Sequence, residues 1–180
     1  MNIWHDIDPR RITPTEFDAV VEINKGSKNK YELDKETGLL KLDRVLYTST
    51  HYPQNYGFIP LTWADDNDPL DVMIIASEPV LPLTLVRCRP IGIFRMEDSG
   101  EIDEKILAIC INDPSYKDIQ NIADLPMHLF EEIRHFFQVY KSLEAKETIV
   151  DHVQDKNLAE ETIARALKRY KEKFYQKFVK

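Results

Sequence analysis

Short apolar segments follow one another along the first two-thirds of the chain, and polar turns separate them. Their side chains are largely apolar and β-branched, a composition that predicts buried strands. Pro90 divides two of the segments, which we therefore expect to be separate strands. Several short strands at close spacing favour a small barrel or sandwich. The segments are residues 17–23, 72–76, 83–88, 91–96 and 105–111.

A hairpin is predicted between residues 31 and 42. Residues 31–33 and 39–42 are the expected strands, and residues 34–38 form the turn between them. Gly38 can take the positive φ angle that closes such a loop.

The apolar positions change to a helical period in the last third of the chain. The first helix has Asp124 as its expected N-cap and Pro126 near its start, where proline is tolerated. The second is expected to begin at Asn157, with Glu160 three residues later as in a capping box. Its apolar stripe should pack in the core or against another subunit. The first apolar face is Leu129, Ile133, Phe136, Phe137 and Tyr140; the second stripe is Ile163, Leu167, Tyr170, Phe174 and Phe178.

Length and composition change this picture only slightly. The chain has 180 residues, which fits one domain better than two and is enough to bury a core without disulfides. Its two cysteines, Cys88 and Cys110, lie in apolar segments and are expected to be buried free thiols. The N-terminus has no basic region followed by an apolar stretch, and no apolar segment approaches the ~20 residues of a membrane helix. We therefore expect a soluble, cytoplasmic protein.

The net charge of −7 and the pI of about 5.3 disfavour non-specific binding of nucleic acid, which requires clustered positive charge. An acidic protein can still bind a small anion where metal ions and a few lysines or arginines reverse the local field.

Four aspartates crowd into residues 65–71. Such a segment is usually a solvated acidic turn. Here Pro69 stiffens it, and the apolar strand that follows anchors it. Like charges that are fixed close together need neutralisation, which hard cations with oxygen ligands supply. The segment therefore predicts a divalent-metal site.

An EF-hand calcium loop does not fit this segment. Counting from Asp66, the third position is Asp68, as required. The fifth, sixth and twelfth positions are Leu70, Asp71 and Ser77, where the loop needs an oxygen ligand, a glycine and a bidentate glutamate. Zinc is also disfavoured, because the five histidines show no HExxH spacing. Carboxylate ligands favour Mg²⁺ or Mn²⁺.

Two further segments are candidates for the same site. Residues 97–105 are acidic and lie between two predicted strands, which alone would indicate a surface hairpin loop. Residues 51–60 are unusually aromatic for a plain loop, and tyrosine hydroxyls can donate to phosphate oxygens, although most such tyrosines simply pack. The glycine-rich nucleotide-binding motifs GxxxxGK[ST] and GxGxxG are absent from the sequence.

Residues 66–72, DNDPLDV, match the form D-x-D-P-x-D-V, the signature of the soluble family I inorganic pyrophosphatases, which the chain resembles. Other motifs of that family follow in order, and the resemblance covers roughly residues 17–141. Gln54 occupies a variable place in one motif, and the position of Gly100 differs slightly from some members. The other matching features are Glu22 in the first strand, KYE at 30–32, DR at 43–44, YPQNYG at 52–57, the spacing of Asp98, Asp103 and Lys105, and FFQVYK at 136–141.

The resemblance implies an α+β fold with a mainly β core, an OB-like five-stranded β-barrel with flanking α-helices. It implies a single inorganic pyrophosphatase domain over residues 1–180 that hydrolyses pyrophosphate to two phosphates. The implied cofactor is Mg²⁺, several ions per active site, with Mn²⁺ or Zn²⁺ able to substitute. The implied assembly is a homo-oligomer, a homohexamer as in prokaryotic members of this length. From the net charge and the short apolar segments we expect no nucleic-acid or membrane partner.

The resemblance also implies roles for the carboxylates. Asp66, Asp71 and Asp103 would be the principal metal ligands, and Asp98 would help to bind a further metal that arrives with the substrate. Asp68 would orient and deprotonate the attacking water as the general base. Metals that bridge the oxygens of the substrate cancel its charge and lower the pKa of a bound water.

The remaining matched residues are implied to act on the phosphates or on metal-bound water. Cations stabilise charge as the P–O bond breaks, and tyrosines fix orientation. The implied phosphate-binding residues are Lys30, Arg44, Tyr56, Lys105, Tyr140 and Lys141, and Glu22, Glu32 and Tyr52 would support the site from behind.

Two alternatives from other functional classes remain open on the residues alone. One is a non-catalytic OB-fold module whose Tyr52, Tyr56 and Phe58 stack on nucleic-acid bases, which the net charge of −7 opposes. The other is a structural metal-binding protein without turnover.

Overall fold

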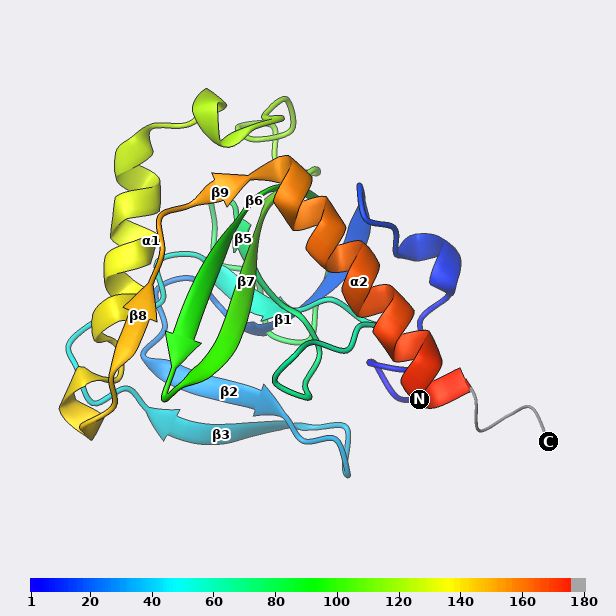
Figure 1. The fold of residues 1–180 in the computed structure, drawn as a ribbon, viewed down its shortest axis with the longest axis horizontal. Helices are drawn as coiled ribbons and strands as arrows, with labels where there is room; N and C mark the ends of the chain where they lie inside the picture. Colours follow the sequence, from blue (N-terminus) through cyan, green and yellow to red (C-terminus); the bar gives the residue numbers. More distant parts are fainter. Residues whose placement is uncertain (176–180) are drawn as a thin grey trace.

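A closed ring of strands forms the centre of the molecule in the computed structural model, which describes residues 1–175 (Figure 1). Each strand of the ring pairs with the next, and the last strand pairs back with the first. The prediction of an OB-like barrel in an α+β fold is confirmed. In order around the ring the strands are β1 (Phe17–Ile23), β4 (Asn55–Phe58), β5 (Asp71–Ile75), β7 (Glu101–Cys110) and β6 (Leu85–Asp98).

The pairing of β5 with β7 matters most for the site. These two strands are parallel, whereas the other neighbours in the ring are antiparallel. Their register places Asp71 beside Lys105. Asp103 lies two residues before Lys105 on β7, and therefore on the same face of the sheet. Side chains from two distant parts of the sequence are thus held together by the backbone ladder.

The strand β6 corrects two predictions. It is one continuous strand, and Pro90 does not divide it, because a register shift between Pro90 and Gly92 accommodates the proline. The acidic segment 97–105, predicted to be a hairpin loop, does join β6 to β7 as a hairpin, but most of its residues belong to the two strands. Strands β6 and β7 meet at a tight turn in which Ser99 (φ 53°) and Gly100 (φ 84°) have left-handed backbone. Strand β7 consequently begins at Glu101, four residues before the predicted start.

The predicted hairpin is confirmed as a separate two-stranded sheet of β2 (Asn29–Leu33) and β3 (Leu40–Val45), which lies below the barrel in Figure 1. Gly38 has the expected positive φ angle, 76°. The backbone N–H of Leu33 donates to a carboxylate oxygen of Glu22 on β1 at 2.7 Å. This bond ties the end of β2 to the barrel.

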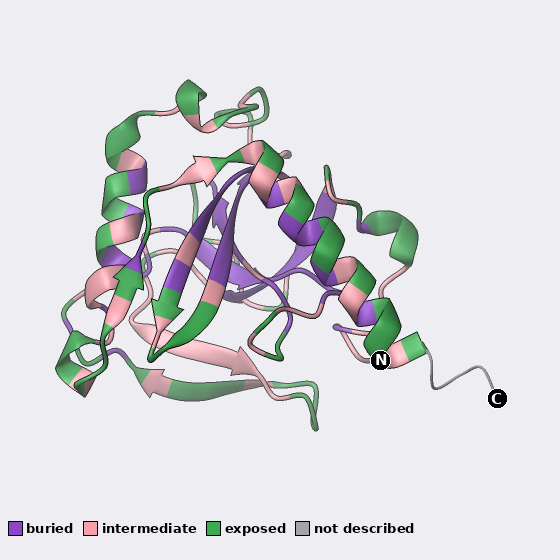
Figure 2. Cartoon of the chain, viewed as in Figure 1, coloured by how far each residue is buried: buried purple, intermediate pink, exposed green. Residues whose placement is uncertain are grey.

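The first long helix, α1 (Met127–Val139), packs against one side of the barrel with Phe130, Ile133, Phe136 and Phe137 buried (Figure 2). Its N-cap is Pro126, so the prediction of Asp124 as the cap is wrong. Asp124 instead ends the 3₁₀ turn Ile122–Asp124, where its carboxylate accepts from the backbone N–H groups of Gln120 and Asn121. That local turn competes with the helix for the same aspartate.

The second long helix, α2 (Lys156–Phe174), begins one residue before the predicted start. Asp155 caps it by accepting from the backbone N–H of Leu158 at 3.2 Å. Its apolar stripe belongs to the core: Ile163 and Tyr170 are buried, and Leu167 and Phe174 pack against the same cluster. The stripe is therefore occupied within the subunit. Phe178, the last predicted member, lies outside the described residues.

Short elements complete the described chain. Strand β8 (Thr148–Val150) pairs with β6, as does β9 (Gln154–Asp155). The 3₁₀ turns are Pro9–Arg11, Ile122–Asp124 and Ser142–Glu144. Both cysteines are free thiols; Cys88 is buried and Cys110 half-buried. Within residues 1–175, no helix combines the length and apolar character needed to cross a membrane.

Candidate active site

A cavity of about 280 Å³ is lined by residues of β2, of the ring strands and of the end of α1. Its walls combine carboxylates, lysines and tyrosines, whereas most ligand pockets are lined mainly by apolar side chains. The polar lining residues are Glu22, Lys30, Tyr31, Glu32, Lys35, Tyr52, Tyr56, Asp66, Asp68, Asp71, Asp103, Lys105, Tyr140 and Lys141.

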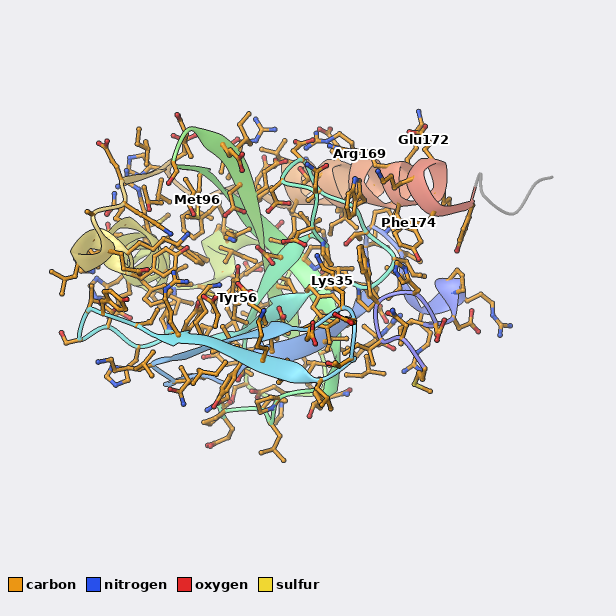
Figure 3. All side chains as sticks on the ribbon, turned by 90° about the horizontal axis from the view of Figure 1, so that it is seen from below. Lys35, Tyr56, Met96, Arg169, Glu172 and Phe174 are labelled. Carbon is orange, nitrogen blue, oxygen red and sulfur yellow. The ribbon has the colours of Figure 1, made fainter. Side chains whose placement is uncertain are left out.

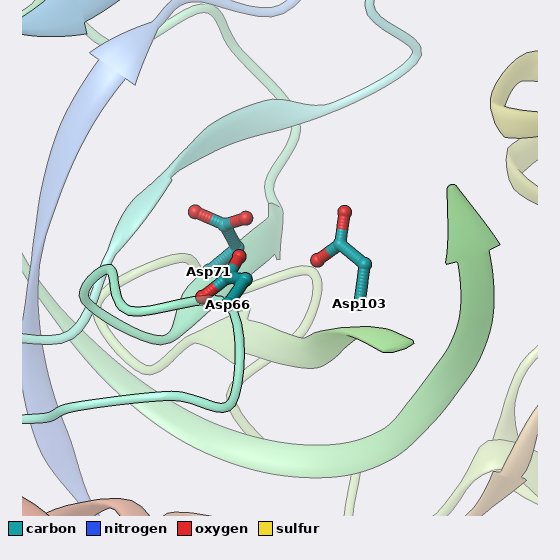
Figure 4. A group of neighbouring side chains, drawn as sticks. All are labelled: Asp66, Asp71 and Asp103. Carbon is teal, nitrogen blue, oxygen red and sulfur yellow. The ribbon is translucent and has the colours of Figure 1, made fainter. Parts of the chain in front are cut away.

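Three aspartates form the acidic part of this cavity (Figure 4). Asp66 lies in the loop before β5, Asp71 is the first residue of β5, and Asp103 lies on β7. One carboxylate oxygen from each lies within 4.8 Å of one from each of the others. Such an all-oxygen set fits a hard divalent cation. The structure therefore brings together the three residues that were predicted to be the principal metal ligands.

The loop that carries Asp66 and Asp68 owes its shape to the residue between them. Asn67 has φ 63°, in the left-handed region, which asparagine tolerates better than most residues. The backbone N–H of Asn67 donates to the carbonyl of Ala64 at 3.2 Å, and that of Ala64 to the carbonyl of Asp68 at 2.8 Å. These bonds close a tight turn that presents Asp66 and Asp68 at the cavity.

The mutual repulsion of the aspartates changes the pKa of Asp66. Partial burial, together with the charges of Asp71 and Asp103, raises the pKa of Asp66 to about 6. A bound cation relieves both contributions, because it replaces lost hydration and neutralises the neighbouring charges.

Lys105 is the cationic centre of the site. It is only 4% exposed, and its ammonium lies 2.6 Å from Asp71 Oδ2 and 3.0 Å from Asp103 Oδ2. Burial alone lowers the pKa of Lys105, but the two carboxylates outweigh burial and hold that pKa well above its usual value. The ammonium also lies 5.4 Å from the ring centroid of Tyr56. Lys105 is thus charged and fixed beside the acidic cluster.

Glu22 is almost completely buried in the wall of the cavity. Burial raises the pKa of its carboxyl to about 8; the hydrogen bond from Leu33 opposes this, and the charge of Asp71 adds to it. Glu22 therefore carries a proton near neutral pH while the cluster has no cation, and it can release that proton when positive charge enters.

Three tyrosines line the part of the cavity nearest α1. Tyr52, Tyr56 and Tyr140 are each less than one-tenth exposed. Burial raises the pKa of all three hydroxyls above the usual value. They therefore remain protonated at neutral pH and can donate hydrogen bonds. Their rings also pack together with Phe136, which fixes their directions.

Two predicted phosphate-binding residues lie on neighbouring strands of the hairpin. Lys30 on β2 pairs with Glu32 and lies 3.6 Å from Asp43. Arg44, its register partner on β3, pairs with Asp43, and its Nε lies 2.9 Å from Glu144. Lys30 and Glu32 line the cavity, whereas Arg44 lies behind that lining.

The last predicted pair joins two further elements. Lys141, just after α1, forms an ion pair with Asp98 at the end of β6. Burial raises the pKa of Asp98, but the ion pair with Lys141 outweighs burial and holds that pKa below its usual value. Lys141 lines the cavity, and Asp98 lies behind it. Asp98 is thus coupled to the site but stands apart from the triad of Asp66, Asp71 and Asp103.

The structure adds two residues to the site that the sequence motifs did not include. Lys35 lines the cavity and pairs with Asp68, and Glu144 pairs with Arg44. Both lie outside regular strands and helices, so neither has a periodic pattern. Their only sequence signal is charge close to a recognised motif: Lys35 follows KYE by three residues, and Glu144 follows FFQVYK by three.

Residues 19–171 match the family model described as inorganic pyrophosphatase. Soluble inorganic pyrophosphatase 5 of Arabidopsis thaliana is 51% identical over 169 residues, which span 94% of this chain and 78% of the relative. The soluble inorganic pyrophosphatase of Zea mays is 48% identical over 167 residues, 93% of this chain and 78% of the relative.

Solved structures give the same result. The inorganic pyrophosphatase from Thermus thermophilus superposes with a TM-score of 0.91 at 38% identity, covering 95% of this chain and 99% of that one. The inorganic pyrophosphatase from Schistosoma japonicum has a TM-score of 0.87 at 27% identity, covering 95% of this chain and 71% of that one.

Proposed function

Since the chain belongs to the inorganic pyrophosphatase family and hydrolyses pyrophosphate to two phosphates, we propose that the cavity around Asp66, Asp71 and Asp103 is its active site. The observation that carries the proposal is the meeting of this carboxylate cluster with the buried, charged Lys105 in a single cavity. The enzyme class excludes a purely structural metal-binding role and a nucleic-acid-binding module without turnover.

The family is metal-dependent, and we propose Mg²⁺ as the metal, with Mn²⁺ or Zn²⁺ able to substitute. Asp66, Asp71 and Asp103 would hold it, because their oxygens already converge. Asp98 would help to hold a further ion that enters with the substrate. When bound, the ions supply charge neutralisation of pyrophosphate and acidification of bound water. The all-carboxylate donor set supports Mg²⁺ over softer metals.

Asp68 is the proposed general base. It lies on the same tight turn as Asp66, lines the cavity, and is more than half exposed, so water can reach it. Its carboxylate would accept the proton of the attacking water, while the oxygen of that water attacks phosphorus and the other phosphate leaves. A positioned general base contributes about 10²–10⁴-fold to a rate.

The cations and tyrosines of the cavity are proposed to hold the phosphate oxygens. The Lys105 ammonium would remain charged throughout, because the carboxylates of Asp71 and Asp103 stabilise its positive charge. The protonated hydroxyls of Tyr56 and Tyr140 would donate to oxygens and fix their direction. Fixed donors around the reacting group stabilise charge as it develops. Lys30, Arg44 and Lys141 complete the proposed set.

Glu22, Glu32 and Tyr52 are proposed to support the site from behind. Glu22 joins the barrel to the end of β2 through Leu33, so it sets the position of the hairpin wall. Its proton, held with a pKa of about 8, would leave as positive charge fills the cavity. Glu32 holds Lys30, and Tyr52 packs against Tyr56 and Phe136.

We also propose one domain over residues 1–180, assembly as a homohexamer, and a cytoplasmic location. The free thiols of Cys88 and Cys110 suit a reducing compartment. A hexameric assembly finds support in the exposed Leu81, Leu83 and Leu85, which are 78%, 47% and 39% exposed near the start of β6. Light scattering measures this assembly directly.

The function is tested by phosphate release from pyrophosphate. We expect turnover with Mg²⁺, loss of turnover when a chelator removes the metal, and recovery when Mg²⁺ is added back. Release that continues undiminished with chelator would contradict the proposed role of the aspartate cluster.

A further inference from the structure

Lys35 occupies the tip of the β2–β3 sheet, at the end near the N-terminal segment and α2 (Figure 3). The turn that carries it is well braced. The backbone N–H of Gly38 donates to the carbonyl of Asp34 at 2.8 Å, and the hydroxyl of Thr37 donates to the Asp34 carboxylate at 2.6 Å. The backbone position of Lys35 is therefore fixed, while its long side chain can change direction.

Two partners from distant parts of the sequence meet the Lys35 ammonium. It forms an ion pair with Asp68, the proposed base, and lies 5.2 Å from the ring centroid of Trp4. The ring is a fixed support, because Trp4 is 4% exposed and its indole N–H donates to the carbonyl of Thr62 at 3.1 Å. Cation–π attraction favours this position of the ammonium beside the cavity that Lys35 lines.

Lys35 is also the most exposed of the four lysines that line the cavity. Its side chain is 45% exposed, against 17% for Lys30, 14% for Lys141 and 5% for Lys105. Its partner Asp68 is 56% exposed. Ion pairs that are this exposed contribute only ~0–1 kcal/mol, so a stronger anion displaces the carboxylate.

We propose that Lys35 is a substrate-binding residue that exchanges partners, pairing with Asp68 in the empty site and with a phosphate oxygen once pyrophosphate binds. This inference rests on the proposed role of Asp68. Pyrophosphate carries several negative charges whereas the Asp68 carboxylate carries one, so the Coulombic attraction of the ammonium to pyrophosphate is the stronger. The exchange frees Asp68 for its water when substrate is present.

The exchange of partners by Lys35 affects the binding of the divalent cation and the binding of pyrophosphate in opposite directions. In the empty site, Lys35 neutralises part of the acidic cluster and so opposes the binding of a divalent cation. In the loaded site, it attracts the substrate. Removing its charge should strengthen binding of the cation alone and weaken binding of pyrophosphate. A purely structural role for Lys35 would weaken both or neither.

The test uses the variant Lys35→Gln in the full-length protein. Calorimetry of the metal-free protein with Mn²⁺ alone should show binding about threefold tighter or more. Steady-state kinetics at saturating Mg²⁺ should show a KM for pyrophosphate raised about tenfold, with kcat within about twofold. This split is expected because Lys35 would bind the substrate and the transition state equally well. Lys35→Arg keeps the charge and should restore both quantities to within about threefold of wild type.

Lys41→Gln is the matched control, because Lys41 is an exposed lysine on β3 of the same hairpin and is not part of the cavity lining in the described chain. It should change neither quantity. Unchanged or weaker Mn²⁺ binding in Lys35→Gln, an unchanged KM, or a loss confined to kcat would each overturn the proposal. Failure of Asp68 as base would be seen separately, as turnover in Asp68→Asn.

Discussion

Asn67 sets the geometry of the acidic loop at the scale of a single residue. Its left-handed backbone, φ 63°, lets the chain turn between Asp66 and Asp68 without losing the hydrogen bonds to Ala64. A β-branched side chain resists that conformation, whereas glycine adopts it freely. The signature residues on either side therefore depend on a neighbour that has no proposed part in the chemistry.

We predict opposite outcomes for two substitutions of this residue. Asn67→Val should lower the free energy of unfolding by about 1–3 kcal/mol, because it strains the backbone, and should weaken metal binding. Asn67→Gly should stay within about 1 kcal/mol of wild type. Urea unfolding with matched metal measures both. Equal costs for the two variants would show that the loop does not require this backbone angle.

At the scale of elements, β4 must lie very close to β1. A Cβ atom on Gly57 would lie 1.8 Å from the backbone carbonyl oxygen of Val20, so no side chain fits between the strands. This close approach positions Tyr56, the neighbour of Gly57, at the cavity. The glycine of the YPQNYG motif is thus explained by strand packing.

Gly57→Ala should therefore be far more costly than an ordinary glycine substitution. We expect a loss of more than about 3 kcal/mol in unfolding free energy, or insoluble protein, because backbone must move to admit the methyl group. Gly26→Ala is the control: Gly26 has φ 86° but nothing within 4 Å of its added Cβ, so only the backbone cost of about 1–2 kcal/mol applies. Similar denaturant midpoints for the two variants would contradict this account.

Some of the elements were predicted correctly from the sequence, and others were not. Local patterns predicted strands β1 and β5, the β2–β3 hairpin and both long helices, because periodicity and turn chemistry are local. They failed where strand pairing carries the chain through Pro90, and where a local turn takes Asp124 from the start of α1. The motifs pointed to Asp66, Asp71 and Asp103, but their meeting depends on the parallel β5–β7 register. Lys35 was missed because nothing local shows where a hairpin tip will lie.

For the whole molecule, the aspartate cluster and Glu22 link stability to pH and metal. The pKa of Asp66 is raised to about 6 and that of Glu22 to about 8. At these two carboxyls the folded state without metal therefore binds more protons than the unfolded state between about pH 4 and pH 8. The stability that these protons provide is present at low pH and is lost as the pH rises through the folded-state pKa values.

A cation should compensate for this loss, so the increase in Tm caused by saturating Mg²⁺ should be larger at pH 8 than at pH 5. At about 100 times Kd the gain would be roughly 2.7 kcal/mol. Protons compete with the metal for the same carboxylates at pH 5, which reduces the gain there. Thermal melts with Mg²⁺ and with chelator at both pH values measure it. An equal increase at the two pH values would argue against metal binding by Asp66.

The central claim is that this cavity carries out the hydrolysis with Asp68 as its base, and the kcat of Asp68→Asn tests it most directly. Asp65→Asn is the control, because the adjacent Asp65 pairs with Arg169 of α2 and lies outside the cavity lining of the described residues. We predict that Asp68→Asn lowers kcat by about 10²–10⁴-fold with an unchanged melt, while Asp65→Asn keeps near-normal turnover. Near-normal turnover in Asp68→Asn would contradict the account.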